Sequence, residues 1–255
     1  MKSEVLYERL DSLLETDAYS DVDPSPNGLQ VGPASQPVEH VAFAVDAAVE
    51  TVDRAREAGA DVLVTHHGVV WGGLDRVTGQ HYRRIAPLVD DEISLFVAHL
   101  PLDGHQDIGN AAGIADVLDL GNRAPFGTLE GQYVGQRGQI PTPMTSEEIR
   151  AALAGALDTK DEPVRVLDFG PSTIRDVAVV TGAGSDWLEE AAETGADALV
   201  TGEGKAKLYH EARETGVTVF LAGHYATETF GVRALQERVS EWGLETTYVD
   251  CPTGL

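Results

Sequence analysis

Hydrophobic and polar positions along the chain follow two different periods, one typical of strands and one typical of helices. Residues 41–46 and 62–64 are nearly continuous apolar runs, which favours buried strands of a parallel sheet. The residues between them carry apolar positions at helical spacing and lead into Gly59, which suits a helix C-terminus. The pattern predicts a strand–helix–strand unit with a right-handed crossover.

The same unit occurs a second time in the chain. Residues 41–68 align with residues 177–204 without a gap, and 12 of the 28 positions are identical. A third apolar stretch and a helical pattern follow in each copy. We therefore expect an α/β fold of two related domains made by internal duplication, each a three-layer αβα arrangement, with residues 1–125 in the first and residues 126–255 in the second.

A segment over residues 126–170 is extra to the repeat. It predicts a strand at 132–140, a helix opened by Thr145 with Glu148 three residues later as a capping box, and a strand at 163–169. The pattern does not decide on which domain the C-terminal helix and strand pack.

Acidic residues outnumber basic ones by 42 to 18, and the net charge is −24. Such a field repels nucleic-acid phosphates, whose binding needs clustered lysine and arginine, so we expect no nucleic-acid partner. A dispersed excess of acid is typical of halophilic proteins, with a mildly acidic mesophilic protein as the alternative. No apolar run is long enough to span a membrane, the start lacks a signal-peptide pattern, and Cys251 is the single cysteine. These features predict a cytoplasmic protein.

Side chains that bind metals follow strands at corresponding places in both copies. They are His66, His67, His99 and Asp103 in the first copy, and Glu203, His224 and Glu228 in the second. Two of the histidines are followed four residues later by an acid, so one helical turn would direct both members of each pair the same way. Imidazole and carboxylate together suit zinc or another divalent transition ion. The carboxyl ends of these strands are therefore the predicted metal site.

The tandem histidines His66 and His67 need an explanation, because successive side chains on a strand point to opposite faces. We expect the strand to end at Thr65 and Gly68 to release the backbone, so that both rings turn toward one pocket but reach different ions. The alternative is a loop with one structural histidine, and each histidine–acid pair alone could be a salt bridge at a helix start. Residues 182–185 read Gly-Ala-Gly-Ser and indicate a tight turn, with a phosphate site as the alternative.

Four motifs, in order and spacing, resemble the Nif3-like family, also labelled GTP cyclohydrolase 1 type 2 or YbgI-like dinuclear metal-centre proteins. The motifs are Asn27-Gly28-Leu29-Gln30-Val31-Gly32, Val64-Thr65-His66-His67-Gly68, Ala98-His99-Leu100-Pro101-Leu102-Asp103 and Ala222-Gly223-His224-Tyr225-Ala226-Thr227-Glu228. The resemblance implies a two-domain α/β subunit with a metal cleft between the domains, assembled as a homohexamer.

Carried over by position, the resemblance implies two divalent ions per subunit, of Zn, Mn, Fe or Ni. It makes His66 and Asp103 the terminal ligands of one ion. It assigns His67 and His224 to the other, with Glu228 bridging the two.

His99 corresponds to a family histidine near the metals, to which we assign proton transfer or support of the metal ligands. The family often has His-Thr-Asn-Leu-Asp where this chain has His99-Leu-Pro-Leu-Asp103, so polar contacts from that turn are not expected here.

The resemblance implies a dinuclear metal-dependent hydrolase, similar to GTP cyclohydrolase type 2, that acts on a small nucleotide-type substrate. Phosphoester hydrolysis would use the same centre. The alternative is a non-catalytic, metal-binding hexamer with a regulatory or scaffold role, so enzyme activity stays open.

Overall fold

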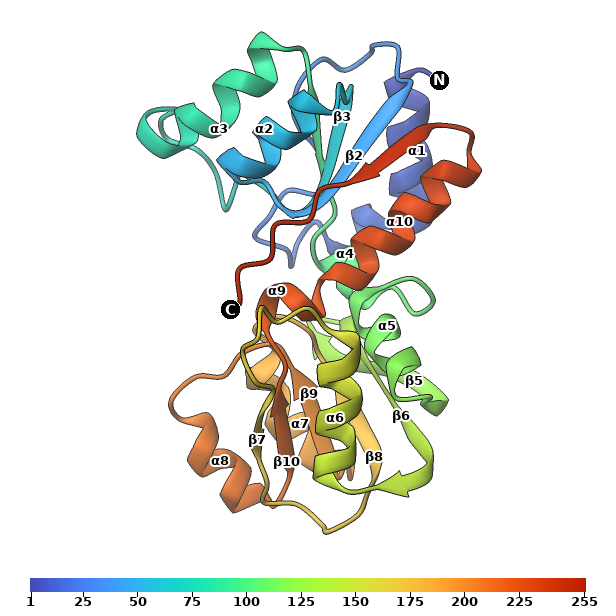
Figure 1. Ribbon diagram of the computed structural model, residues 1–255, viewed down its shortest axis with the longest axis vertical. Coiled ribbons are helices and arrows are strands. Elements are labelled where there is room, and N and C mark those ends of the chain that lie inside the picture. The colour runs from blue at the N-terminus through green and yellow to red at the C-terminus, as the bar shows by residue number, and fades with distance from the viewer. The chain divides into compact units, whose positions relative to one another are not determined.

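Two β-sheets with parallel central strands organise the chain in the computed structural model, which describes residues 1–255. The chain divides into unit 1, residues 1–102 and 231–251, and unit 2, residues 103–230 and 252–255. Each unit has its own sheet and its own apolar core (Figure 1). No helix is both long and apolar enough to cross a membrane.

The sheet of unit 1 has the strand order β1-β4-β3-β2-β11. All of its strands run parallel except β1, which pairs antiparallel with β4 at one edge. The elements of this unit are α1 (Ser3–Leu14), the short 3-10 helix Thr16–Tyr19, β1 (Gly28–Val31), β2 (His40–Asp46), α2 (Val49–Glu57), β3 (Val62–His67), α3 (Gly79–Asp90), β4 (Ser94–Val97), α10 (Thr229–Glu241, of which the part from Gly231 on belongs to unit 1) and β11 (Glu245–Tyr248).

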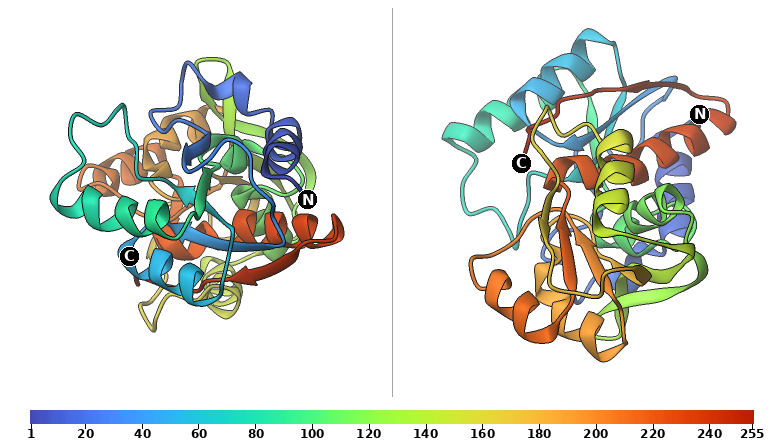
Figure 2. Two further views of the ribbon diagram at one scale, coloured as in Figure 1. Left: turned by 90° about the horizontal axis from the view of Figure 1, so that it is seen from above. Right: turned by 60° about the horizontal axis from the view of Figure 1, so that its bottom comes forward.

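Helices cover both faces of the unit 1 sheet. Alternate residues of β2, β3 and β4, such as Ala44, Leu63 and Leu95, pack with buried residues of α2 and α3 in one core. On the opposite face Phe96 stacks on Tyr7 of α1, with ring centroids 5.5 Å apart. Figures 1 and 2 show α10 beside α1 on that face. The C-terminal helix and strand, which the pattern left undecided, therefore pack in unit 1.

The sheet of unit 2 has the order β5-β6-β8-β9-β10-β7, in which β8, β9 and β10 are parallel neighbours. Helices α5 and α6 bury their apolar faces on one side of it. The elements of this unit are α5 (Asn110–Val117), β5 (Gly121–Leu129), β6 (Gln132–Met144), α6 (Ser146–Ala156), β7 (Arg165–Leu167), β8 (Ile174–Val179), the 3-10 turn Gly184–Trp187, α7 (Leu188–Glu193), β9 (Ala198–Thr201), α8 (Leu208–Thr215), β10 (Thr218–Leu221) and α9 (His224–Thr227).

The predicted repeat is the parallel core of each unit, since β2-β3-β4 and β8-β9-β10 have the same order and direction. Helix α6 begins after Thr145, whose hydroxyl and main chain exchange hydrogen bonds with Glu148, so the capping box is confirmed. Strand β7 is shorter than predicted, and β5 was not predicted at all.

The division of the chain differs from the expected boundary between residues 125 and 126. Helix α5 belongs to unit 2, because Ala111, Ile114 and Ala115 bury their side chains in the core formed with α6 and the strands of that unit. A short helix, α4 (Leu100–Gly104), carries the chain across the boundary after Leu102. The boundary follows the burial of an apolar helix face, which the repeat alone does not reveal.

Candidate metal centre

Three imidazoles gather at one edge of the unit 1 sheet, and we call His66, His67 and His99 the imidazole cluster. The first two are the last residues of β3, and the third follows β4, its parallel neighbour. One ring nitrogen of each lies within 4.8 Å of the other two. The carboxyl ends of neighbouring parallel strands meet at one edge of a sheet, which is why residues from two separate stretches of the sequence converge here.

Each ring of the imidazole cluster is held through its Nδ1 atom by an oxygen. The three contacts are His66 Nδ1 with the Ala98 carbonyl at 2.9 Å, His67 Nδ1 with Asp46 Oδ1 at 2.9 Å, and His99 Nδ1 with Asp23 Oδ1 at 2.8 Å. A proton on Nδ1 that is donated to oxygen leaves the lone pair on Nε2, the nitrogen that would bind an ion. The chemistry of the cluster therefore fits a transition-metal ion.

Asp23 is a functional candidate that the sequence analysis missed. Its side chain is 1 % exposed, and it accepts hydrogen bonds from Asn27 Nδ2 (2.8 Å) and the main-chain N–H groups of Ser25 (2.8 Å) and Leu100 (3.0 Å) besides His99. Burial alone would raise the pKa of the Asp23 carboxyl, but the hydrogen bond and charge of His99 and the other donors outweigh it and hold the pKa below its usual value. Asp23 thus stays ionised and fixes the ring of His99.

The expected end of the strand at Thr65 is wrong, because β3 continues through His67. Pairing of β3 with β4 stops at Thr65, while its pairing with β2 reaches His67 opposite Asp46. The strand end is held from one side only, and the Asp46 carboxylate on that side holds the His67 ring. His66 is buried and His67 is partly exposed, yet their ring centroids are 4.6 Å apart.

Unit 2 holds the other predicted ligands, and we call Asp103, His224 and Glu228 the carboxylate–histidine cluster. One carboxylate oxygen of Asp103 lies within 4.8 Å of one of Glu228. Asp103 Oδ1 accepts hydrogen bonds from Asn110 Nδ2 (2.8 Å) and Thr181 Oγ1 (3.1 Å). These contacts orient the Asp103 carboxylate.

The predicted helical turn at His224 is confirmed as α9, with Glu228 directly after it. His224 Nε2 lies 3.2 Å from Glu228 Oε1, and its Nδ1 lies 3.4 Å from Glu203 Oε1. Burial disfavours the imidazolium, but the two carboxylates outweigh it and raise the pKa of His224 to about 9. At neutral pH, without an ion, His224 is thus protonated and lies between two carboxylates. A metal ion that binds to His224 would have to displace this proton.

Gly182 gives the sequence 182–185 a structural role beside this cluster. Its φ is +56°, and a Cβ built on it would lie 2.1 Å from Glu228 Oε1 and 3.1 Å from His224 Nε2. The residues form a tight turn, as predicted, that runs into the 3-10 turn Gly184–Trp187. Only glycine leaves space for the Glu228 carboxylate at this point.

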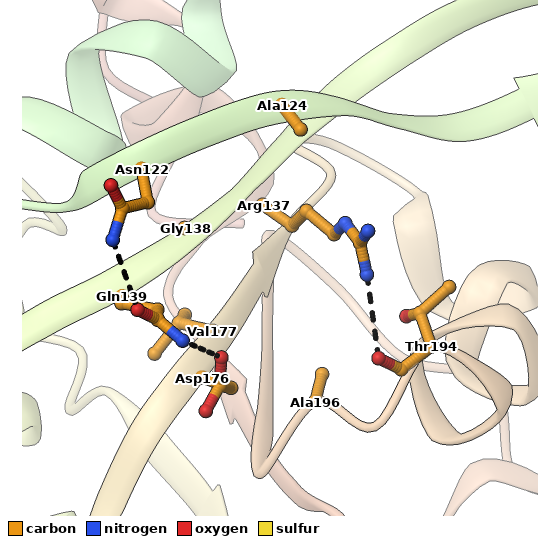
Figure 3. A pocket seen from close by; sticks show the side chains of 9 residues that line it. All are labelled: Asn122, Ala124, Arg137, Gly138, Gln139, Asp176, Val177, Thr194 and Ala196. Carbon is orange, nitrogen blue, oxygen red and sulfur yellow. Dashed lines mark hydrogen bonds between the residues drawn. The ribbon is translucent and has the colours of Figure 1, made fainter.

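Figure 3 shows a separate pocket of unit 2, with a volume of about 350 Å³. It lies at the amino ends of β8 and β9, the opposite end of these strands from Thr181. Its polar groups bond to one another: Asn122 donates to Gln139, which donates to Asp176 (3.1 and 2.8 Å), and Arg137 donates to the Thr194 carbonyl (3.3 Å). We therefore place the candidate site at the histidines and not in this pocket.

Comparison with known proteins agrees with these motifs. A protein of Halobacterium salinarum named GTP cyclohydrolase 1 type 2 homolog is 60 % identical over 245 residues, covering 96 % of each chain. An Escherichia coli K12 protein of the same name is 35 % identical over 254 residues, covering 99 % of each.

Two solved structures resemble the fold over the whole of both chains. One is the protein ybgI, described as of unknown function, with a TM-score of 0.89 and 33 % identity. The other is a protein of Thermus thermophilus, with a TM-score of 0.88 and 35 % identity. The model of the Duf34/NIF3 (NGG1p interacting factor 3) family matches residues 1–253, and the chain belongs to that family.

Proposed function

We propose that this protein is a dinuclear metal-dependent hydrolase that acts on a nucleotide-type substrate. In this proposal His66 and Asp103 bind one divalent ion, His67 and His224 bind the other, and Glu228 bridges them. The observation that carries the proposal is the imidazole cluster, in which every Nδ1 is held by an oxygen, so that His66 and His67 are set to bind an ion through Nε2.

The donor sets of the two units fit this proposal chemically. Neutral imidazole nitrogens and carboxylate oxygens suit Zn, Mn, Fe or Ni, and the carboxylates offset part of the charge of two dications. Glu228 is buried, with its side chain 4 % exposed, so its negative charge is costly unless a cation is near it. His224 supplies such a charge only while it is protonated.

Two such ions would lower the pKa of a bound water and stabilise negative charge on an oxyanion. The chain's own contribution beyond ligation is His99, whose ring Asp23 orients. With Nδ1 held by a carboxylate, His99 Nε2 can take up and return a proton, which assigns it the role of proton donor to the leaving group. The nucleotide substrate rests on the resemblance and on the names of the relatives, and cleavage of a phosphoester is the competing reaction for the same centre.

The test compares Glu228→Gln with His67→Ala in metal-loaded full-length protein. Glu228→Gln retains the shape of the side chain but removes the bridging charge, so both ions should dissociate more readily. His67→Ala should empty mainly one ion. His210→Ala removes an exposed imidazole of unit 2 and is the matched control, which should retain both ions.

Ions per chain are counted by elemental analysis after dialysis, and hydrolysis is screened against nucleotides and simple phosphoesters in parallel. If Glu228→Gln retains two tightly bound ions, Glu228 is not the bridge. If the two-ion protein hydrolyses none of these compounds, the chain is instead a non-catalytic metal-binding protein.

A further inference from the structure

Trp71 differs from the other two tryptophans of the chain in its surroundings. Trp187 donates its indole N–H to the Thr128 carbonyl, and Arg9 lies over the ring of Trp242. Trp71 is 45 % exposed, although its ring is in contact with the imidazole cluster. Its centroid lies 5.0 Å from that of His99, at an interplanar angle of 82°, and 6.0 Å from that of His67. A large aromatic surface is thus open to solvent beside the candidate metal ligands.

The loop that carries Trp71 is held on both sides of the indole. Gln30 Oε1 accepts the main-chain N–H groups of residues 69–70, at 2.9 and 3.1 Å. The N–H of Gly72 donates to the Pro24 carbonyl at 2.7 Å. These bonds fix the backbone immediately before and after the indole, so its exposed surface is preorganised for a ligand.

Charge narrows the kind of ligand that this surface can serve. With 42 acids against 18 bases, the chain has no excess of cations with which to attract a nucleotide through its phosphates. The π-face of an indole binds flat rings without needing an opposite charge, by stacking. Affinity for a nucleotide would then come from its ring at Trp71 and from the ions at its phosphate.

We infer that Trp71 is the stacking platform for a flat heteroaromatic ring, the base of a nucleotide substrate. This inference rests on the proposed function and narrows it, because it selects base-bearing substrates over simple phosphoesters. His99 lies against the same indole, so the ring of the substrate would be held next to the group assigned to proton transfer.

The first measurement is fluorescence of metal-loaded protein carrying Trp187→Phe and Trp242→Phe, in which the emission reports on Trp71 alone. Guanosine 5′-monophosphate and adenosine 5′-monophosphate should quench it with saturation. Ribose 5-phosphate, which has the sugar and phosphate but no base, should not. Equal quenching by all three, or none by any, would overturn the inference.

The second measurement is equilibrium dialysis of the same three compounds with Trp71→Leu and Trp71→Phe. Loss of base stacking should weaken the binding of guanosine 5′-monophosphate about 5- to 150-fold in Trp71→Leu, and Trp71→Phe should restore part of the affinity. Ribose 5-phosphate should bind the unmodified protein and both variants with the same affinity. A change below twofold for the nucleotide, or an equal loss for ribose 5-phosphate, would refute base stacking. Neither assay needs turnover, so a protein that stacks the base but hydrolyses nothing would contradict the hydrolase proposal and support this inference.

Discussion

Replacement of Gly182 by alanine is the most direct probe of the carboxylate–histidine cluster. The added Cβ would lie 2.1 Å from Glu228 Oε1, whereas such contacts are not seen below about 3.0 Å. The oxygen must therefore retreat by about 1 Å. Metal–ligand distances vary by only about 0.2 Å. A displacement of about 1 Å would therefore take the Glu228 carboxylate out of bonding distance of an ion.

The cost in stability has two parts. A side chain at φ +56° costs about 1–2 kcal/mol, part of which the lower entropy of the unfolded alanine chain offsets. Overpacking against the buried Glu228 side chain adds about 1–3 kcal/mol. We expect a total loss of about 2–4 kcal/mol in the free energy of unfolding and a loss of metal affinity of at least about 10- to 100-fold.

Gly195→Ala is the matched control. Gly195 has φ +77°, in the same left-handed region, but nothing lies within 4 Å of its Cβ position. It should lose only about 1 kcal/mol and bind metal as the unmodified protein does. The difference between the two variants therefore isolates the contact with Glu228 from the strain of the backbone.

Urea unfolding of chelated protein measures the first effect, and equilibrium dialysis with elemental analysis measures the second. If Gly182→Ala binds metal as tightly as Gly195→Ala, the Glu228 carboxylate does not serve as a ligand from this position. If both variants lose the same stability, the space beside Gly182 is larger than its contacts indicate.

Three further predictions concern Asp23, His224 and the assembly of the chain. Asp23→Asn should leave both ions bound but lower any hydrolysis about 10- to 100-fold, because the ring of His99 loses its carboxylate; hydrolysis rates and metal counts on one sample check this. In chelated protein the imidazolium of His224, with its pKa of about 9, should stabilise the fold. This stabilisation should be complete below about pH 6.5 and lost as the pH rises through 9. Urea unfolding across this pH range should show the loss, and His224→Gln should abolish the pH dependence. Light scattering in molar salt should give the mass of a hexamer, and smaller species should form on removal of salt as the acidic surfaces repel.

The sequence was sufficient to predict those parts of the fold and site that depend on short stretches of the chain. The parallel core of each unit was predicted from its apolar runs, and the capping box from Thr145 and Glu148. Strand β5 was not predicted because its residues, Gly-Asn-Arg-Ala-Pro-Phe-Gly-Thr-Leu, lack alternation of polar and apolar side chains and are mostly exposed. It is an edge strand that forms through its pairing with β6, and this tertiary contact leaves no pattern in its own residues.

Asp23 could not be found in the sequence for a similar reason. It stands in a proline-rich turn, Asp-Pro-Ser-Pro-Asn, which indicates only a loop. Its partner His99 is 76 positions away, and the contact exists because the turn and the end of β4 meet in the folded unit. Trp71 likewise lies in no recognisable motif, and only its contacts with the rings of His67 and His99 make it a functional candidate.

The structure also explains why the second copy of the repeat has no histidine at the position of His66. His66 aligns with Gly202, and a Cβ on Gly202 would lie 2.7 Å from both the Gly182 carbonyl oxygen and the Cα of His224. Both obstacles are backbone, so they cannot move aside as a side chain can, and the second copy has no room for any side chain at this position. The backbone that excludes it belongs to the glycine beside Glu228 and to His224 itself. Unit 2 therefore presents an imidazole from α9 and none from the residue after β9 that corresponds to His66.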